Sequence, residues 1–293
     1  MMSKSLKKFI LRLSLFAAFL FCYCIVIFIV NYNISDNISI GQKDILIVGD
    51  SGLGAALDPK QMRSAQNICQ NSEPYYLTYL KLKFLFDKNV KPDTVIIGVG
   101  HHNISNYNEY KLKDEFWTNR MFNTTYLLAK DIINIQKIEI DYLQLFLVYS
   151  RNMCLIPKLN HYKSFIGEFQ GRIDHHAINN YQNRIDRVFY YKDYGVSELC
   201  ISYLDSIVDI SVKNKITPIL VSTPVPDAYY ELIPAIIKER YDLIKARYLE
   251  EGIQVIDLTR SQYSPDYFYN EDHLNVRGAR RFTLEVKSIL SDI

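Results

Sequence analysis

Three residues have the types and positions that an acyl-transfer site would need. Ser51 follows a short apolar run in a Gly-Asp-Ser-Gly turn, where small residues allow a sharp bend. Asn103 closes a second apolar run, and His273 lies in a polar loop late in the chain. A serine hydroxyl is a poor nucleophile until a base takes its proton, and the base needs a partner that fixes its tautomer. Ser51 and His273 could serve as nucleophile and base, with the Asn103 amide as an oxyanion donor.

The apolar pattern predicts the elements that would position these residues. Short runs rich in β-branched residues predict buried strands. They lie at residues 44–49, 64–69, 94–99, 216–221 and 254–257. Apolar residues at helical spacing predict helices. These lie at residues 74–86, 196–208, 227–249 and 276–290.

Strands that alternate with helices imply an α/β fold, a three-layer sandwich with a central parallel sheet. In such sheets ligands bind beyond the carboxyl ends of the strands. The loops at those ends hold Ser51 and the segment from Gly100 to Asn103, and a later loop leads to His273. The three candidate residues are therefore expected at one edge of the sheet. Asp50, beside Ser51, is expected to make a local hydrogen bond in the turn.

Residues 104 to about 192 lack this alternation. They are rich in Tyr, Asn and Phe, with one helical stretch predicted near residues 127–147. We interpret them as an insertion or cap upon a single domain of residues 44–293, and not as a separate domain.

The N-terminus is predicted to be a membrane anchor. Residues 13–30 carry no charge, and four basic residues precede them. About 20 apolar residues in a helix span a bilayer core. By the positive-inside rule, the N-terminus stays in the cytoplasm and the rest of the chain is exported. We therefore expect an anchor at residues 1–31 and a linker at residues 32–43.

A cleaved signal peptide is the alternative interpretation of this run. The apolar region of a signal peptide usually has about 7–15 residues and ends at a small-residue cleavage site. The run here is longer, and Ile29 to Tyr32 offer no such site. A retained anchor is therefore favoured, and either interpretation places the domain outside the cytoplasm.

The composition excludes several classes of function. The net charge of +2 comes without a long basic tract, so nucleic acid is not an expected partner. The five cysteines show no metal-ligand spacing and no disulfide framework. The adjacent pairs His101-His102 and His175-His176 would point in different directions, without an acidic cluster to support them. We expect no metal and no cofactor, and we expect His101 or His102 to line the pocket.

Three blocks of the sequence resemble one family, the SGNH or GDSL-type hydrolases. Gly49-Asp50-Ser51 resembles their first block, and the segment Gly100 to Asn103 resembles their G-x-N block. The segment Asp272 to Ala279 resembles their last block, in which the catalytic histidine precedes the final helix. The resemblance implies a flavodoxin-like fold, with Ser51 as nucleophile, His273 as base and Asn103 in the oxyanion hole. The N-terminal anchor resembles the membrane-tethered branches, the teichoic-acid D-alanine transfer and alginate O-acetylation proteins.

Two departures from the family leave roles open. The family places its acid three residues before the histidine, where this chain has Asn270. Either Asp272 substitutes for that acid, or Asn270 orients the imidazole. The family's second block supplies a glycine N–H to the oxyanion hole, whereas residues 67–72 contain no glycine. The backbone N–H of Asn71 is the candidate replacement.

The resemblance implies serine-dependent acyl transfer on a cell-envelope glycan through an acyl-serine, by an O-acyltransferase or an esterase. An integral membrane acyltransferase would then be a partner. The alternative is a catalytically inactive SGNH-like domain that binds polysaccharide or acts as a scaffold in the envelope. The distance between Ser51 and His273 is the feature that discriminates the two.

Overall fold

A computed structural model describes residues 3–38, 40–135, 140–158, 165–173, 180–190 and 195–291. Five parallel strands form one sheet, in the order β2-β1-β3-β4-β5. They are β1 (Ile45–Val48), β2 (Ala65–Asn67), β3 (Thr94–Gly98), β4 (Thr217–Ser222) and β5 (Gln254–Asp257). The predicted α/β fold with a central parallel sheet is confirmed.

Both faces of the sheet are buried, which explains why the strands read as continuous apolar runs. The strand register pairs Ile47 with Ile96, and Ile96 with Ile219, and all three side chains join one hydrophobic core. Their neighbours along the strands, such as Leu46 and Val95, join a second and larger core on the other face. Successive side chains of a strand point to opposite faces, so each strand contributes to both cores.

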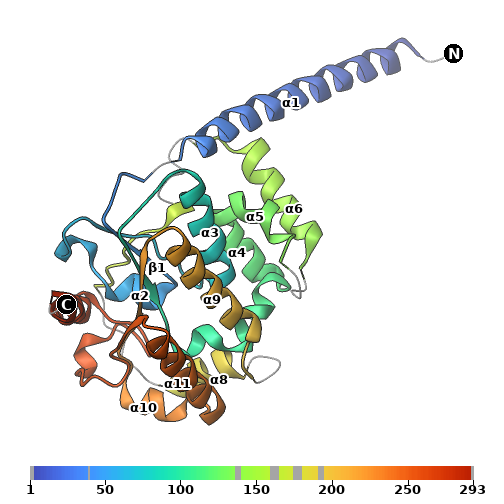
Figure 1. The fold of residues 1–293 in the computed structure, drawn as a ribbon. Helices are drawn as coiled ribbons and strands as arrows, with labels where there is room; N and C mark the ends of the chain where they lie inside the picture. Colours follow the sequence, from blue (N-terminus) through green and yellow to red (C-terminus); the bar gives the residue numbers. More distant parts are fainter. Residues whose placement is uncertain are drawn as a thin grey trace.

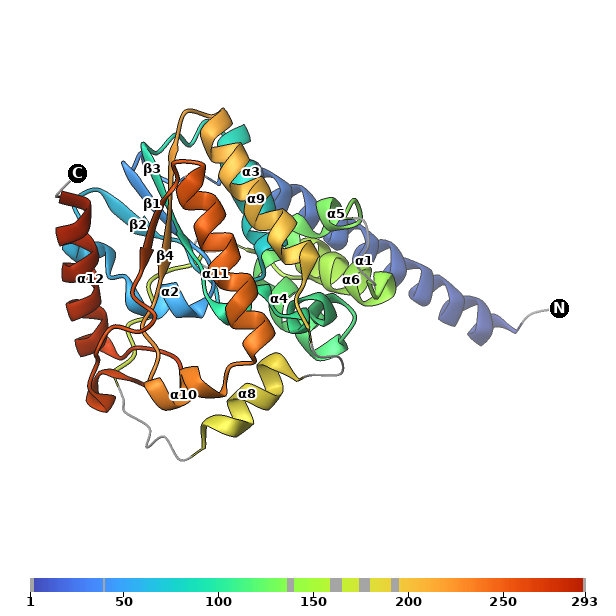
Figure 2. The ribbon, with the colours of Figure 1, turned by 60° about the horizontal axis from the view of Figure 1, so that its bottom comes forward.

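Helices cover each face of the sheet (Figures 1 and 2). The larger core is covered by α3 (Tyr75–Asp87), α9 (Glu198–Lys213) and α11 (Ala235–Glu250). The smaller core is covered by α2 (Ser51–Ala56) and α12 (Val276–Ser291). Two short 3₁₀ turns, η1 (Pro59–Gln61) and η6 (Pro265–Tyr267), complete the elements on that side.

The single helix predicted at residues 227–249 is wrong in one respect, because it is two helices. The first, α10 (Asp227–Leu232), ends before Ile233, and α11 begins after Pro234. A proline lacks the N–H that a continuous helix would need and restrains the preceding residue to an extended conformation. Ile233 has that conformation, with φ −64° and ψ 132°.

The predicted insertion contains more helix than the sequence indicated. The helix expected at residues 127–147 is wrong. Three shorter elements replace it, namely η4 (Tyr126–Leu128), α5 (Ala129–Ile132) and α6 (Tyr142–Ser150), and residues 136–139 lie outside the described part of the chain. Buried side chains of this region, such as Phe122 and Ile185, share the larger core with α3 and α9. The elements are η2 (His101–Ile104), η3 (Asn106–Leu112), α4 (Glu115–Thr125), η4 (Tyr126–Leu128), α5 (Ala129–Ile132), α6 (Tyr142–Ser150), the π-helical η5 (Arg151–Leu155) and α8 (Tyr181–Phe189).

The N-terminal helix α1 (Lys4–Asp36) projects from the domain (Figure 1). It is long and apolar enough to cross a membrane, and only 6% of its most apolar window is buried. The helix continues to Asp36, through the first part of the segment that we expected to be a linker. Ile38 and Ile40, which follow it, are buried in the larger core.

Candidate active site

The turn before Ser51 depends on a glycine and an aspartate. Gly49 has φ +136°, and a Cβ there would lie 3.3 Å from the Gly98 backbone of the neighbouring strand, so no other residue fits easily. Asp50 then caps α2, because its Oδ1 accepts a hydrogen bond from the Gly52 N–H at 2.9 Å. Ser51 is the first residue of the helix and is buried. The local role predicted for Asp50 is therefore present.

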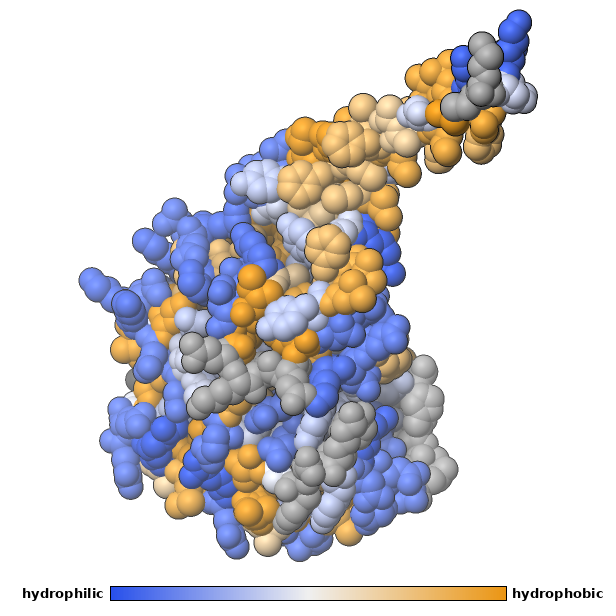
Figure 3. Space-filling model, turned by 90° about the vertical axis from the view of Figure 1, so that its right-hand side faces the viewer, coloured by the Kyte–Doolittle hydropathy of each residue, from blue (hydrophilic) through white to orange (hydrophobic). Residues whose placement is uncertain are grey.

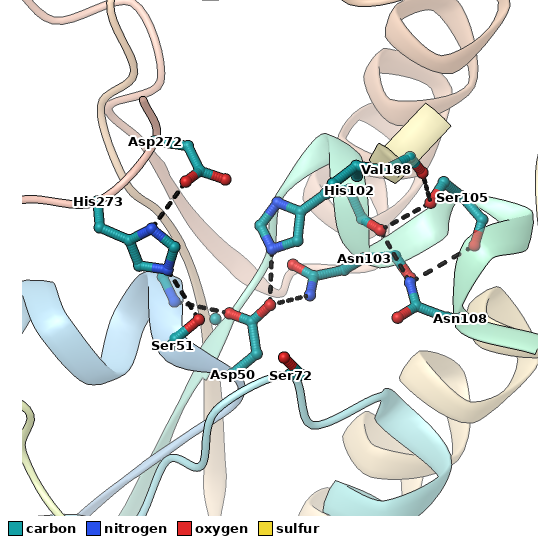
Figure 4. A network of polar contacts seen from close by, with 12 residues as sticks. Asp50, Ser51, Ser72, His102, Asn103, Ser105, Asn108, Val188, Asp272 and His273 are labelled. Carbon is teal, nitrogen blue, oxygen red and sulfur yellow. Dashed lines mark hydrogen bonds and ion pairs between the residues drawn. The ribbon is translucent and has the colours of Figure 1, made fainter. Parts of the chain in front are cut away.

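The structure brings Ser51 and His273 together across 222 positions of sequence. Ser51 Oγ and His273 Nε2 lie 2.8 Å apart, and both residues are buried (Figure 4). The His273 backbone is fixed by Asn270, whose Oδ1 accepts a hydrogen bond from the His273 N–H at 3.0 Å. The His273 carbonyl accepts a second bond from the Tyr269 N–H at 2.8 Å.

Two side chains face the other imidazole nitrogen. Asn270 Oδ1 lies 3.0 Å from His273 Nδ1 with hydrogen-bond geometry. Asp272 Oδ1 is closer to Nδ1, at 2.7 Å, and makes an ion-pair contact with the ring. The two candidates therefore act differently on His273. Asn270 accepts the hydrogen bond, and Asp272 places a negative charge beside the ring.

An arginine that the sequence did not indicate completes this group. Arg184 of α8 donates from Nε to Asp272 Oδ2 at 2.8 Å, and its Nη2 lies 2.7 Å from the same oxygen. Burial alone would raise the pKa of Asp272, but Arg184 and then His273 hold it well below the ordinary value. Arg184 lies in the region without clear periodicity, and no sequence signal links it to a carboxylate 88 positions away.

A second polar cluster lies on the other side of Ser51 (Figure 4). Asp50 Oδ2 is 2.6 Å from His102 Nε2 and accepts a hydrogen bond from Asn103 Nδ2 at 3.0 Å. Burial would raise the pKa of Asp50, but the charge of His102 and these hydrogen bonds hold it well below the ordinary value. Asn108 fixes the backbone of the cluster, because its Nδ2 donates to the carbonyls of His102 and Asn103.

These contacts define what Asn103 and Gly100 do in the structure. Asn103 is buried, and one N–H of its amide is committed to Asp50, so at most the second is free for an oxyanion. A Cβ on Gly100 would lie 3.0 Å from the His102 ring, so this glycine makes room for the imidazole. The role of Asn103 in an oxyanion hole stays a prediction.

The loop after β2 lies beside the turn that holds Ser51, because the Gln70 N–H donates to the Gly49 carbonyl at 3.1 Å. Asn71 is exposed, and its side chain accepts a hydrogen bond from Arg172 at 3.1 Å. Ser72 has φ +61°, a conformation that normally favours glycine. The loop thus makes its bend at a serine, since residues 67–72 contain no glycine.

A buried ion pair stabilises the loop that follows β2. Lys81 Nζ lies 2.6 Å from Glu73 Oε2, and both side chains are almost fully buried. The same ammonium donates to the carbonyl of Ile68 at 2.8 Å and to that of Ile166 at 3.1 Å. The pair therefore ties the loop to α3 and to the segment around Ile166.

A second buried lysine, Lys111, also contacts the loop that follows β2. Lys111 Nζ donates to the Ser72 carbonyl at 2.9 Å, and its ammonium lies 4.8 Å from the centre of the Tyr107 ring. Burial lowers the pKa of Lys111 to about 8, although the charge of Asp50 opposes this shift.

The adjacent histidines His101 and His102 have different surroundings. His101 stacks on Tyr241 at 4.1 Å between ring centres, and burial lowers its pKa to about 3, so it is neutral. His101 and His102 both line a cavity of about 20 Å³ that extends to Asp272. Within the described residues, no group of three or more His, Cys, Asp or Glu could hold a metal ion. His175 and His176 lie outside the described residues.

No family model and no curated protein matches the chain. Among solved structures, it is similar to a GDSL-like lipase from Bacteroides thetaiotaomicron, with 11% identity over 91% of this chain and 98% of that chain, and a TM-score of 0.45. It is also similar to a proposed acylhydrolase from Bacteroides fragilis, with 11% identity, coverage of 89% and 93%, and a TM-score of 0.44.

An acetyl xylan esterase from Butyrivibrio proteoclasticus has 10% identity to the chain, coverage of 87% and 65%, and a TM-score of 0.34. At these low scores, the similar structures do not indicate an activity for this chain, and the geometry of its own residues has to do so.

Proposed function

We propose that this protein is a membrane-anchored serine esterase or O-acyltransferase of the SGNH type. Ser51 is the nucleophile and His273 is the base. The observation that carries this proposal is the 2.8 Å contact between Ser51 Oγ and His273 Nε2. It is the distance at which an imidazole can take the proton of an attacking hydroxyl.

The reaction has two halves. Ser51 Oγ attacks the acyl carbon while its proton moves to His273 Nε2, and the alcohol then leaves with that proton. His273 next takes a proton from water or from an acceptor hydroxyl, which attacks the acyl-serine and releases Ser51. In each half the imidazolium faces the Asp272 carboxylate, 2.7 Å from Nδ1, and keeps its orientation through Asn270 at 3.0 Å.

The oxyanion is held by the backbone N–H of Ser51 and by the Asn103 amide. The contact of Asn103 with Asp50 at 3.0 Å supports this role, because it fixes the amide plane before the substrate arrives. Donors that need no rearrangement during the reaction contribute most to catalysis. Removal of one such donor costs about 10²–10³ in rate. The backbone N–H of Asn71, in the loop that contacts the turn before Ser51, is the candidate for a third donor.

The substrate is an acyl group that is carried to or from a cell-envelope glycan. The anchor supports this part of the proposal, since the basic residues of α1 lie in its first turns, before the uncharged run of residues 13–30, and favour an exported domain at the membrane surface. An integral membrane acyltransferase is the proposed acyl donor.

The ion pair of Arg184 with Asp272 favours a second candidate function. A cation beside the carboxylate reduces the stabilisation that Asp272 can give to an imidazolium. A domain with an impaired base would act as a binding or scaffold protein for envelope polysaccharide, without turnover.

Turnover of a simple ester distinguishes the two candidates. Full-length protein in detergent is given p-nitrophenyl acetate, alone and with an oligosaccharide acceptor. We expect hydrolysis that falls about 10³-fold or more in Ser51→Ala and in His273→Ala. Ser202→Ala, an exposed serine of α9, is the matched control and keeps the wild-type rate. Wild-type turnover equal to that of Ser51→Ala would favour the scaffold. Acetylated oligosaccharide would identify a transferase.

A further inference from the structure

The segment formed by α6, η5 and the residue that follows them, residues 142–156, carries an apolar face that the domain does not bury. Leu143 and Phe146 are 69% and 65% exposed. Soluble monomers seldom expose a large contiguous apolar patch. The other large apolar side chains exposed in this segment are Tyr142, Leu147, Leu155 and Ile156.

The same segment packs against α1. The Tyr23 hydroxyl donates to the Leu155 carbonyl at 3.1 Å. Asn31, only 1% exposed, donates from Nδ2 to three carbonyls, and its Oδ1 accepts from the Lys158 N–H at 2.8 Å. The carbonyls belong to Asn152, Met153 and Ile156, at 3.1, 3.0 and 2.7 Å.

These hydrogen bonds attach the end of the α6 and η5 segment to the side of α1. The last carbonyls of a helix have no partner within the helix, and Asn31 supplies one for the end of this segment. Figures 1 and 2 both show α6 beside the part of α1 that is nearest the domain. The position of α1 in a membrane therefore sets the position of the segment.

The length of the apolar part of α1 determines how deep the α6 and η5 segment lies relative to the membrane. Tyr23 lies about 10 Å along the helix before Val30, inside the uncharged run, at 1.5 Å per residue. The part of α1 that precedes the contact, Phe9 to Cys22, has 14 residues that are all uncharged except Arg12, and it would be roughly 21 Å long. A bilayer core is about 30 Å thick, so the part of α1 in contact with the segment must also lie in hydrocarbon.

The exposed face suits that environment. The stretch from Tyr142 to Ser150 contains no charged residue. Arg151 is the one charged residue of the segment, and its guanidinium donates to the Asn123 side chain of α4. Figure 3 shows apolar side chains that extend from α1 onto the adjoining face of the domain. Lipid requires an uncharged surface of this kind.

We propose that the exposed face of the α6 and η5 segment lies in the outer leaflet of the membrane that α1 crosses. The inference rests on the proposal that α1 is a membrane anchor. The domain is then held against the bilayer by two elements at a fixed height, and does not swing on a flexible linker.

Tryptophan probes test this placement in the full-length protein. Trp117 is the only tryptophan of the chain and is first changed to phenylalanine. Phe146→Trp and Leu143→Trp are then made separately in that background. Phe16→Trp on α1 is the lipid-exposed reference, and Leu243→Trp on α11, which is 62% exposed, is the reference for water. Each variant is reconstituted in phosphatidylcholine vesicles, with and without bromine on the acyl chains.

We expect the two segment probes to lose fluorescence in brominated vesicles to an extent close to that of Phe16→Trp, while Leu243→Trp is unchanged. Quenching of Phe16→Trp alone would overturn the inference and leave the anchor intact. An unquenched Phe16→Trp would overturn the anchor as well. Segment probes with blue-shifted but unquenched emission would mean that protein covers the face, which also contradicts the proposal.

Discussion

Replacement of Arg184 by alanine would leave the carboxylate beside His273 without its cation. Asp272 and Arg184 are 4% and 19% exposed, so the contact is a buried ion pair and not a surface one. Loss of one partner of such a pair costs about 3–5 kcal/mol, because the other charge stays buried without compensation. We expect a loss near the lower figure, about 3 kcal/mol, since His273 still faces the carboxylate. That corresponds to a melting temperature lower by roughly 6–12 °C.

The change also affects the base. Without the guanidinium, the pKa of Asp272 rises from its depressed value, and its interaction with the His273 imidazolium strengthens. The acid limb of the activity profile therefore moves to higher pH. The stability difference from wild type is fully present at neutral pH. It shrinks as the pH falls below about 4, where the unfolded carboxyl takes up a proton.

The assay combines thermal unfolding with ester hydrolysis from about pH 5 to about pH 9. Arg184→Lys keeps a positive charge and is expected to lie between wild type and Arg184→Ala. Arg187→Ala, an exposed arginine on the same helix, is the matched control. If Arg184→Ala matched Arg187→Ala in both melting temperature and acid limb, the inferred coupling of Arg184 to the base would be refuted.

Three further predictions concern neighbouring groups. Glu73→Gln leaves the Lys81 ammonium buried without its partner and should lower the free energy of unfolding in urea by about 3–5 kcal/mol. The double variant Glu73→Leu with Lys81→Met should recover much of this loss. Equal losses in the single and the double variant would contradict the prediction. The pKa of Lys111, lowered to about 8 from 10.5, makes the folded state release its proton first. The stability of wild type relative to Lys111→Met should therefore rise between these pH values, and a flat difference would count against it. Asn270→Asp places a carboxylate against His273 Nδ1. In the pH profile of ester hydrolysis, we expect a higher plateau rate and an acid limb at higher pH. A lower plateau rate would argue against a hydrogen-bonding role for Asn270.

The sequence predicted the sheet well because buried parallel strands have a local signature. The runs at β1, β3 and β4 are apolar on both faces, and this pattern needs no knowledge of the partner strands. Since Ser51 and Asn103 directly follow such runs, their common position at the sheet edge was also predictable.

Other features depend on packing between distant segments and have no local signature. The contact of Arg184 with Asp272, and the use of Asp50 to hold His102 and Asn103, join residues more than 50 positions apart. The burial of Asn31 in α1 is of the same kind, because its carbonyl partners lie more than 120 positions later. The division between α10 and α11, in contrast, could have been predicted from the sequence, because a proline at position 234 interrupts a continuous helix.

Labelling with a fluorophosphonate probe is the most direct test of Ser51 as an activated nucleophile, since such probes react with activated serines and not with ordinary hydroxyls. Full-length protein in detergent is labelled, digested and mapped by mass spectrometry, with Ser51→Ala and His273→Ala alongside. We expect one adduct, on the peptide that contains Ser51, and its loss in both variants. An unlabelled, folded wild-type protein beside a labelled serine hydrolase would show that Ser51 is not activated, and labelling that persists in His273→Ala would show that His273 is not its base.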